Sequence, residues 1–303
     1  MTLRYRSLGS GSSGNATVVE WLPTSGMPNQ TPSRLLVDCG FGIKHLEARL
    51  LRAGLSGTGI SAIFITHEHG DHIGCAVQLS ERYRLPVWMS AGTYAGVGKP
   101  DLGERLRIAS DEQSFAVGAL QVTPFTVPHD AREPLQLRVE VAQHSAGVTY
   151  GVLGICTDLG HASAHTLRNL AACTHLLLEC NHDAGMLTAS AYPAFLRNRI
   201  SGWAGHLDNV ESERIDTALV KNGQLRHITA AHLSERNNSP AIVRSHLARA
   251  LGCAEADIAI ACPQAGTQWL EVAAHKPIAA MPARAICASS LDFTPLTPTA
   301  PIT

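Results

Sequence analysis

The stretch Thr66-His67-Glu68-His69-Gly70-Asp71-His72 places three histidines and an aspartate within six consecutive positions. It follows the apolar run 60–65, whose length and isoleucine content are typical of a buried strand. Because side chains two positions apart point to the same side of an extended segment, His67 and His69 can bind one ion. Asp71 and His72 follow where the chain turns into a helix, and they can face a second ion. Imidazole nitrogens and carboxylate oxygens are ligands of Zn²⁺ and other first-row divalent cations, so this pattern predicts a metal site rather than a chance surface cluster of histidines.

The pattern His67-x-His69-x-Asp71-His72 resembles the signature of the metallo-β-lactamase fold superfamily, and the resemblance extends roughly from Leu3 to Val272. It implies an α/β (α+β) fold, a single-domain four-layer αββα sandwich that carries one or two metals at its rim. We therefore expect residues 1–273 to form the catalytic domain. Residues 274–303 are rich in Pro, Ala and Thr without periodicity, which predicts a flexible C-terminal tail.

The composition agrees with one folded catalytic unit. The chain has 303 residues, of which 45% are hydrophobic, and this is enough for a substantial core. Its formal net charge of −1 gives no global sign of nucleic-acid binding. The basic residues comprise four lysines and twenty arginines, which favours bidentate phosphate contacts, although a GC-biased genome produces the same skew.

Eight cysteines are spread along the chain without C-x-x-C spacing. The first residues lack the apolar segment of a secretory signal, and no apolar stretch has the length of a membrane span. We therefore expect buried free thiols in a reducing, cytoplasmic protein that does not bind membranes.

The resemblance implies one further ligand for each ion and a bridge between the ions. These three residues each follow a predicted strand: His129 follows 120–127, Asp158 follows 148–156 and His232 follows 225–230. A solvated loop histidine is the alternative for His129. The implied sites are His67, His69 and His129 for the first ion and Asp71, His72 and His232 for the second, with Asp158 bridging both.

Asp38 ends another apolar run, 35–37. The resemblance implies that its carboxylate supports a metal histidine by accepting the other ring proton, which fixes the tautomer of that histidine. The alternative is that Asp38 caps the helix predicted from Ile43 to Ala53, and the two uses are compatible.

In addition to Asp71, three polar residues are candidates for catalysis. Glu179 and His182 crowd the end of the strand predicted from His175, where we expect them to orient groups near the metals; solvated turn residues are the alternative. His206, in the segment Gly205-His206-Leu207-Asp208-Asn209, resembles the loop histidine of the nuclease branch, which implies that it protonates the departing oxygen. Asp208 departs from the serine that is commoner there, and a helix cap beside a bystander histidine is the alternative.

Two polar segments are predicted to contact the substrate. The loop 9–15, rich in Gly and Ser, can hold an anion with its backbone amides and hydroxyls, although a plain hairpin loop is the alternative. The motif His232-Leu-Ser-x-x-Asn-Asn resembles the YycJ-type (WalJ-type) branch and offers neutral donors for a phosphate oxygen or a nucleotide edge. The predicted substrate-binding residues are Ser10, Ser12, Ser13, Asn15, Ser234, Asn237 and Asn238.

The segments between these motifs carry no assigned chemistry. The apolar spacing predicts one continuous helix from Ile73 to Tyr83. We expect a solvated loop from Pro23 to Ser33 and a loop-rich segment with a short helix over 92–103.

Two ion sites that share a carboxylate suit phosphodiester cleavage, because paired cations stabilise the attacking and leaving oxygens together. We expect two divalent ions, Zn²⁺ or alternatively Mn²⁺, with a metal-bridging hydroxide as the nucleophile. The resemblance implies a 5′→3′ exonuclease acting on nucleic acid, DNA rather than RNA, and it leaves the oligomeric state open, a homodimer included. The alternative is a small-molecule hydrolase with the same ligands: a cyclic phosphodiesterase, lactonase, lactamase or thiolesterase.

Overall fold

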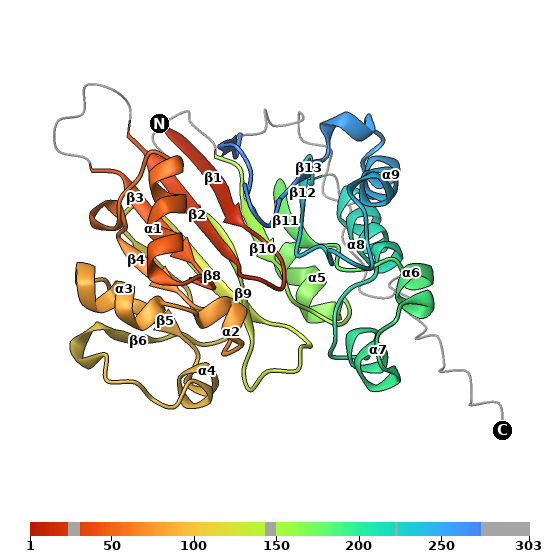
Figure 1. Ribbon diagram of the computed structural model, residues 1–303. Helices are drawn as coiled ribbons and strands as arrows, with labels where there is room; N and C mark the ends of the chain where they lie inside the picture. The colour runs from red at the N-terminus through yellow and green to blue at the C-terminus, as the bar shows by residue number, and fades with distance from the viewer. Residues whose placement is uncertain (24–30, 143–149, 222–223, 274–303) are drawn as a thin grey trace.

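Two seven-stranded sheets lie face to face in the computed structural model, which describes residues 1–23, 31–142, 150–221 and 224–273 (Figure 1). In spatial order, the first sheet consists of β14 (Leu270–Glu271), β1 (Thr2–Gly9), β2 (Ala16–Leu22), β3 (Ser33–Val37), β4 (Ala62–Phe64), β5 (Val87–Met89) and β6 (Leu106–Ile108). The second sheet consists of β13 (Ala259–Ile260), β12 (His227–Ala231), β11 (His175–Glu179), β10 (Leu153–Cys156), β9 (Leu135–Val141), β8 (Leu120–Thr126) and β7 (Phe115–Val117).

Side chains from both sheets fill the space between them. Alternation in β1 buries Leu3 and Tyr5, whereas the intervening Arg4 is half-buried. The hydroxyl of Tyr5 lies 2.7 Å from Oγ1 of Thr229 in β12, so a hydrogen bond joins the two sheets inside the core. Burial raises the pKa of Tyr5 to about 12, and the hydroxyl therefore stays neutral.

Helices cover the outer face of each sheet (Figure 1). Leu46 and Leu50 of α1 (Ile43–Arg52) pack against the first sheet, and Ile215 and Leu219 of α8 (Asn209–Lys221) pack against the second. The order helix, sheet, sheet, helix confirms the predicted four-layer αββα sandwich. The other helices are α2 (Gly70–Ile73), α3 (Ala76–Tyr83), α4 (Ala91–Gly96), α5 (Ala164–Leu170), α6 (Ala184–Ala189), α7 (Ala194–Ile200), α9 (Pro240–Leu251) and the 3₁₀ turns Gly57–Gly59, Gly103–Arg105 and Glu255–Asp257.

Strand direction brings the predicted site residues to one edge of the sandwich. β3 and β4 run parallel in the first sheet, and β10, β11 and β12 run parallel in the second. β8 has the direction of β10, because each is antiparallel to β9. Carboxyl ends of strands that share a direction lie at the same edge of a sheet. The site residues occupy these ends: Asp38 after β3, 67–72 after β4, His129 after β8, Asp158 after β10, Glu179 in β11 and His232 after β12.

Gly74 interrupts the helix predicted from Ile73 to Tyr83. Its φ of +32° lies outside the helical region, and a Cβ at this position would lie 2.2 Å from the carbonyl oxygen of Cys39. The helix α2 therefore ends at Ile73, and α3 begins only at Ala76. The prediction of one continuous helix is wrong because the chain after β3 packs closely against α2.

The remaining predictions on strands, loops and cysteines are partly confirmed, partly corrected and partly outside the described residues. The strand expected from Val148 is shorter, since β10 begins at Leu153, and 143–149 lie outside the described residues. The predicted tail 274–303 and most of the predicted loop after Pro23 also lie outside them. Five cysteines are buried free thiols as expected, but Cys253 is exposed. Among the described residues, every helix is too short or too polar to cross a bilayer.

Candidate metal centre

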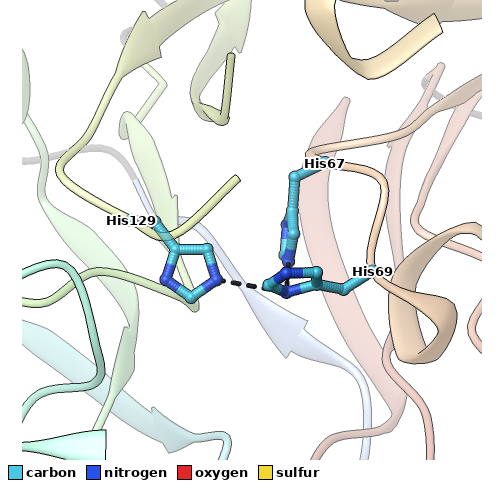
Figure 2. Close-up of side chains that lie close together, drawn as sticks. All are labelled: His67, His69 and His129. Atoms are coloured by element: carbon cyan, nitrogen blue, oxygen red, sulfur yellow. Dashed lines mark hydrogen bonds between the residues drawn. The ribbon is translucent and has the colours of Figure 1, made fainter. Parts of the chain in front are cut away.

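Three imidazoles converge where the loops after β4 and β8 meet (Figure 2). Nε2 of His67 lies 3.0 Å from Nδ1 of His69, and Nε2 of His129 lies 3.4 Å from the same atom. Nitrogen ligands of a tetrahedral zinc ion, each about 2.0–2.1 Å from the metal, lie roughly 3.3–3.4 Å apart. The three nitrogens are therefore spaced as ligands of a single ion.

Burial favours the neutral, cation-binding form of two of these imidazoles, those of His67 and His129. Burial, followed by the nearby His72, holds the pKa of His67 well below its usual value, and burial also lowers the pKa of His129. Nδ1 of His129 donates to the carbonyl oxygen of Gly205 at 3.1 Å, which leaves Nε2 with a free lone pair. Neutral imidazoles with oriented lone pairs are suited to a divalent metal.

A second cluster consists of Asp71, His72 and His232, from α2 and from the end of β12. Oδ2 of Asp71 lies 3.6 Å from Nε2 of His72 and 3.6 Å from Nε2 of His232. His232 has a positive φ of 53°, an uncommon backbone conformation for a residue other than glycine. Such strain is often found at functional sites, and here it accompanies a histidine that faces the carboxylate of Asp71.

Asp158 lies between the two clusters. Its Oδ2 is 3.1 Å from Nε2 of His72, and its Oδ1 is 3.2 Å from Nδ1 of His232. Ligand atoms of Asp158, His67 and His72 also lie within 4.8 Å of one another, so the carboxylate reaches the first cluster as well. Burial would raise the pKa of Asp158, but His232 and His72 outweigh it and hold that pKa well below its usual value.

The donor set fits divalent cations. Oδ2 of Asp158 and Nε2 of His232 are buried and have no hydrogen-bond partner among the described residues, which is costly unless a ligand satisfies them. Burial opposes protonation of His232, yet Asp158, Asp71 and Glu179 raise its pKa to about 10. The buried carboxylates therefore favour positive charge at the second cluster, which a metal ion can supply.

Asp38 holds the second cluster from behind. Its Oδ2 accepts a hydrogen bond from Nδ1 of His72 at 2.8 Å, and its Oδ1 accepts one from the backbone N–H of Thr66 at 2.9 Å. The ring proton of His72 is therefore fixed on Nδ1, and Nε2 is left to face the metal. Thr66, which the sequence analysis did not single out, also donates its hydroxyl to Asp38.

Asp38→Asn is expected to weaken metal binding about 10- to 100-fold, because the amide is a poorer acceptor for the ring proton of His72. Asn tolerates the left-handed backbone that Asp38 adopts with a φ of 61°, so the fold should persist. Competition with a metal chelator of known affinity measures the change, and Asp257→Asn, at a distant 3₁₀ turn, serves as the control. Unchanged affinity in Asp38→Asn would show that the hydrogen bond does not support the metal.

Glu179 connects the second cluster to His206. Its Oε1 accepts hydrogen bonds from Nδ1 of His206 at 2.7 Å and from Nδ1 of His232 at 2.9 Å. Its Oε2 accepts the backbone N–H groups of Leu159 and Leu207, so the buried carboxylate is fully satisfied. Burial would lower the pKa of His206, but Glu179 outweighs it and raises that pKa.

The other proposed orienting residue, His182, has a different environment. It is buried beside Asp208, and burial lowers its pKa. Its Nδ1 has no hydrogen-bond partner among the described residues, and no hydrogen bond or ion pair there joins its ring to the two clusters. The structure thus brings Glu179, but not His182, into contact with the predicted ligands.

The loop 9–15 mainly supports the protein's own site. Oγ of Ser10 donates to Oδ1 of Asn15 and accepts the backbone N–H of His232. Nδ2 of Asn15 lies 3.1 Å from Nε2 of His72 and 3.3 Å from Oδ2 of Asp71. Ser10 and Asn15 therefore contact the ligand residues, whereas Ser12 and Ser13 are exposed and can still meet a substrate.

The three predicted substrate-binding residues after His232 also differ in their hydrogen bonds. The side chains of Ser234 and Asn238 bond to the protein, whereas that of Asn237 does not. Oγ of Ser234 accepts the backbone N–H of Asn237. The side chain of Asn238 is taken up by the protein, because Nδ2 donates to Cys180 and Asn209 and Oδ1 accepts from Asn209 and Ser239. The amide of Asn237 is buried and has no partner among the described residues.

Residues that the sequence analysis left unassigned border the first cluster. Arg199 of α7 donates to Asp130 at 2.6 Å, next to His129. Trp203 is 70% exposed, and its ring lies against the imidazole of His161 with centroids 3.4 Å apart. No motif marks these contacts, since they depend on how α7 folds back onto the strand ends.

Comparisons with known proteins agree with this architecture. Residues 33–209 match the family described as Beta-lactamase superfamily domain. Exodeoxyribonuclease YycJ of Bacillus anthracis is 31% identical over 256 residues, which cover 83% of this chain and 90% of the relative. Exodeoxyribonuclease WalJ of Streptococcus pneumoniae serotype 2 is 27% identical over 263 residues, with 85% and 90% covered. The metallo-beta-lactamase fold protein YhfI of Bacillus subtilis superposes with a TM-score of 0.64 at 15% identity, over 89% of this chain and 100% of that one. This chain therefore belongs to the metallo-β-lactamase fold superfamily, in the branch that includes the proteins named YycJ and WalJ.

Proposed function

We propose that this metal-dependent hydrolase is a phosphodiesterase that degrades nucleic acid, and specifically a 5′→3′ exonuclease that acts on DNA. The observation that carries the proposal is the imidazole of His206, which Glu179 holds beside the converging donors of the metal centre. An alkoxide that leaves a phosphodiester needs a proton, and a histidine with a pKa above its usual value can supply one near neutral pH.

The chain's own groups have separate tasks in this proposal. His67, His69 and His129 would hold one cation, and Asp71, His72 and His232 would hold a second, with Asp158 between them. When bound, Zn²⁺ or Mn²⁺ would lower the pKa of a water molecule and stabilise charge on the phosphate oxygens. Asp38 would fix the ring of His72. The catalytic unit would span 1–273, since β14 near the end of this range pairs with β1.

His206 would donate its proton from Nε2. Its Nδ1 already donates to Glu179, so Nε2 is the nitrogen left for a substrate. The side chain is 20% exposed, whereas the carboxylate of Glu179 is fully buried. Glu179 is therefore a positioning residue, which fixes the ring of His206 and favours its protonated form.

The border of the metal centre supports a polymeric substrate. Trp203 lies three residues before His206 and exposes most of its ring, and exposed aromatic rings are platforms on which bases of single strands stack. Arg132, Arg199 and Arg236 are exposed on segments that follow or adjoin the ligand residues, where guanidinium groups can contact phosphates. The names of the two relatives, both exodeoxyribonucleases, support DNA and action from an end.

The direct test offers end-labelled DNA to the purified protein with Zn²⁺ or Mn²⁺. The proposal predicts that a 5′ label is released at once as a mononucleotide, that a 3′-labelled strand shortens progressively, and that chelation stops both reactions until metal is restored. Internal fragments would contradict exonuclease action, and faster loss of RNA would contradict the preference for DNA. Hydrolysis of nitrocefin or a thioester with DNA left intact would establish a small-molecule hydrolase instead.

Trp203→Ala is expected to raise KM for single-stranded DNA roughly tenfold, since stacking on one base contributes about 1–3 kcal/mol. A small diester such as bis-p-nitrophenyl phosphate has no base, so its kcat/KM should fall much less. Leu51→Ala removes another side chain that is 75% exposed, on α1, and serves as the matched control. Equal losses on both substrates would refute stacking on Trp203 and indicate a structural role for its ring.

A further inference from the structure

A pocket of about 350 Å³ lies between the region of α6 and the segment after β12. The volume is at the lower end of the range for pockets that hold small ligands. Two backbone hydrogen bonds connect this region, from Asp183 to the carbonyl of Asn237 and from Ser234 to that of Asn181. The lining residues are Met186, Ala189, Ser190, Ala191, Tyr192, Arg236 and Asn237.

The amide of Asn237 is the unusual feature of this pocket. The residue is 1% exposed, yet neither Oδ1 nor Nδ2 has a hydrogen-bond partner among the described residues. Its backbone is fixed on both sides, because its N–H donates to Oγ of Ser234 and its carbonyl accepts from Asp183. A buried amide without hydrogen-bond partners is unfavourable. A ligand that supplies both a donor and an acceptor would satisfy the amide, and its binding would therefore be favourable.

The neighbouring side chains narrow the chemistry of that ligand. Tyr192 offers an aromatic face, and the guanidinium carbon of Arg236 lies 5.9 Å from the centre of its ring. Arg236 is exposed and forms no ion pair within the described ranges, so it is available to a phosphate. An aromatic face, an arginine and an amide that can both donate and accept match a nucleobase with its phosphate, because the edges of bases present donors and acceptors side by side.

The sequence limits how far this pocket can lie from the metal centre. Asn237 follows His232 by five residues, a distance of at most about 18 Å even for extended chain. A base bound here would therefore belong to a nucleotide within a few positions of the phosphate at the metal centre.

We propose that this pocket binds one nucleobase of the substrate strand, with the amide of Asn237 reading its edge and Arg236 contacting an adjacent phosphate. The inference rests on the proposed nuclease function and adds a substrate subsite to it. Binding at a fixed distance from the metals would let the enzyme sense whether a base is present at that position.

An abasic scan tests the pocket. Single-stranded oligonucleotides carry one tetrahydrofuran residue at successive positions from the 5′ end, and kcat/KM is compared with that of the intact strand. One position is expected to lower kcat/KM about tenfold, in line with the loss of one bound base. In Asn237→Ala the intact strand should be cut more slowly, and the same abasic residue should cause no further loss. Asn198→Ala, an exposed asparagine on α7, should keep the wild-type profile.

The outcomes separate the pocket from the proposed function. Cleavage of DNA with a flat abasic profile, or with the same profile in Asn237→Ala as in the wild type, would overturn the pocket and leave the nuclease proposal standing. Failure to cleave any DNA would overturn the proposed function and this inference with it. Thermal unfolding checks the variant, since removing an unpaired buried amide should leave its Tm unchanged or higher. Arg236→Ala, at an exposed position, provides a second variant: it removes a phosphate contact that an abasic residue keeps, so kcat/KM should fall while the dependence on the abasic position stays as in the wild type.

Discussion

Asp158→Asn is expected to lose bound metal and to lower kcat/KM on DNA by roughly 10³-fold or more. The carboxylate contacts His72 through Oδ2 and His232 through Oδ1, both in the second cluster, and it lies within 4.8 Å of a ring nitrogen of His67 in the first. A neutral amide removes the negative charge that would balance two cations, and metal ions contribute several kcal/mol to stabilising charge in such reactions. Elemental analysis of the purified variant and turnover of labelled DNA measure the two effects.

Asp216→Asn provides a matched control for this substitution. Asp216 is also a completely buried aspartate, but it lies on α8 outside both clusters, and burial raises its pKa well above the usual value. Burial therefore favours the neutral carboxyl form, which an amide resembles, and the substitution should change the metal content little. Full metal content and activity in Asp158→Asn would contradict the bridging position assigned to Asp158.

His206→Ala is expected to lower kcat on DNA by about 10²- to 10⁴-fold while metal content stays at the wild-type level. His206 belongs to neither set of implied ligands, but its ring lies against the metal centre and is oriented by Glu179. Loss of a proton donor affects the chemical step rather than metal binding. Single-turnover kinetics and elemental analysis on the same preparation measure both quantities.

The leaving group distinguishes proton donation from a structural effect. A p-nitrophenolate ion departs without a proton, so His206→Ala should reduce hydrolysis of bis-p-nitrophenyl phosphate far less than hydrolysis of DNA. His246→Ala, at a surface histidine paired with Glu213, controls for removing an imidazole elsewhere. Equal losses of His206→Ala on both substrates would show that the ring supports the site without donating a proton.

Much of the fold and of the candidate ligand set could be predicted from the sequence, because the candidate ligands follow closely after segments whose pattern predicts strands. Each of these predicted strands ends one or two residues before a site residue. The structure accordingly brings His67, Asp158 and His232 to one edge.

What the sequence could not predict depends on contacts between distant segments. The helix breaks at Gly74, where the carbonyl of Cys39 lies close to the backbone, and no local sequence pattern predicts that contact. The motif suggests that Asn237 and Asn238 are equivalent donors. In the fold, however, the side chain of Asn238 already bonds to Cys180 and Asn209, whereas that of Asn237 has no partner among the described residues. The border with Trp203 likewise depends on where α7 lies.

Anomalous diffraction from crystals of the protein loaded with Zn²⁺ or Mn²⁺ locates each bound ion independently of activity. We expect two peaks, one among the ring nitrogens of His67, His69 and His129 and one among Asp71, His72 and His232, with the carboxylate of Asp158 between them. A single peak, or peaks away from these residues, would rule out the paired metal site.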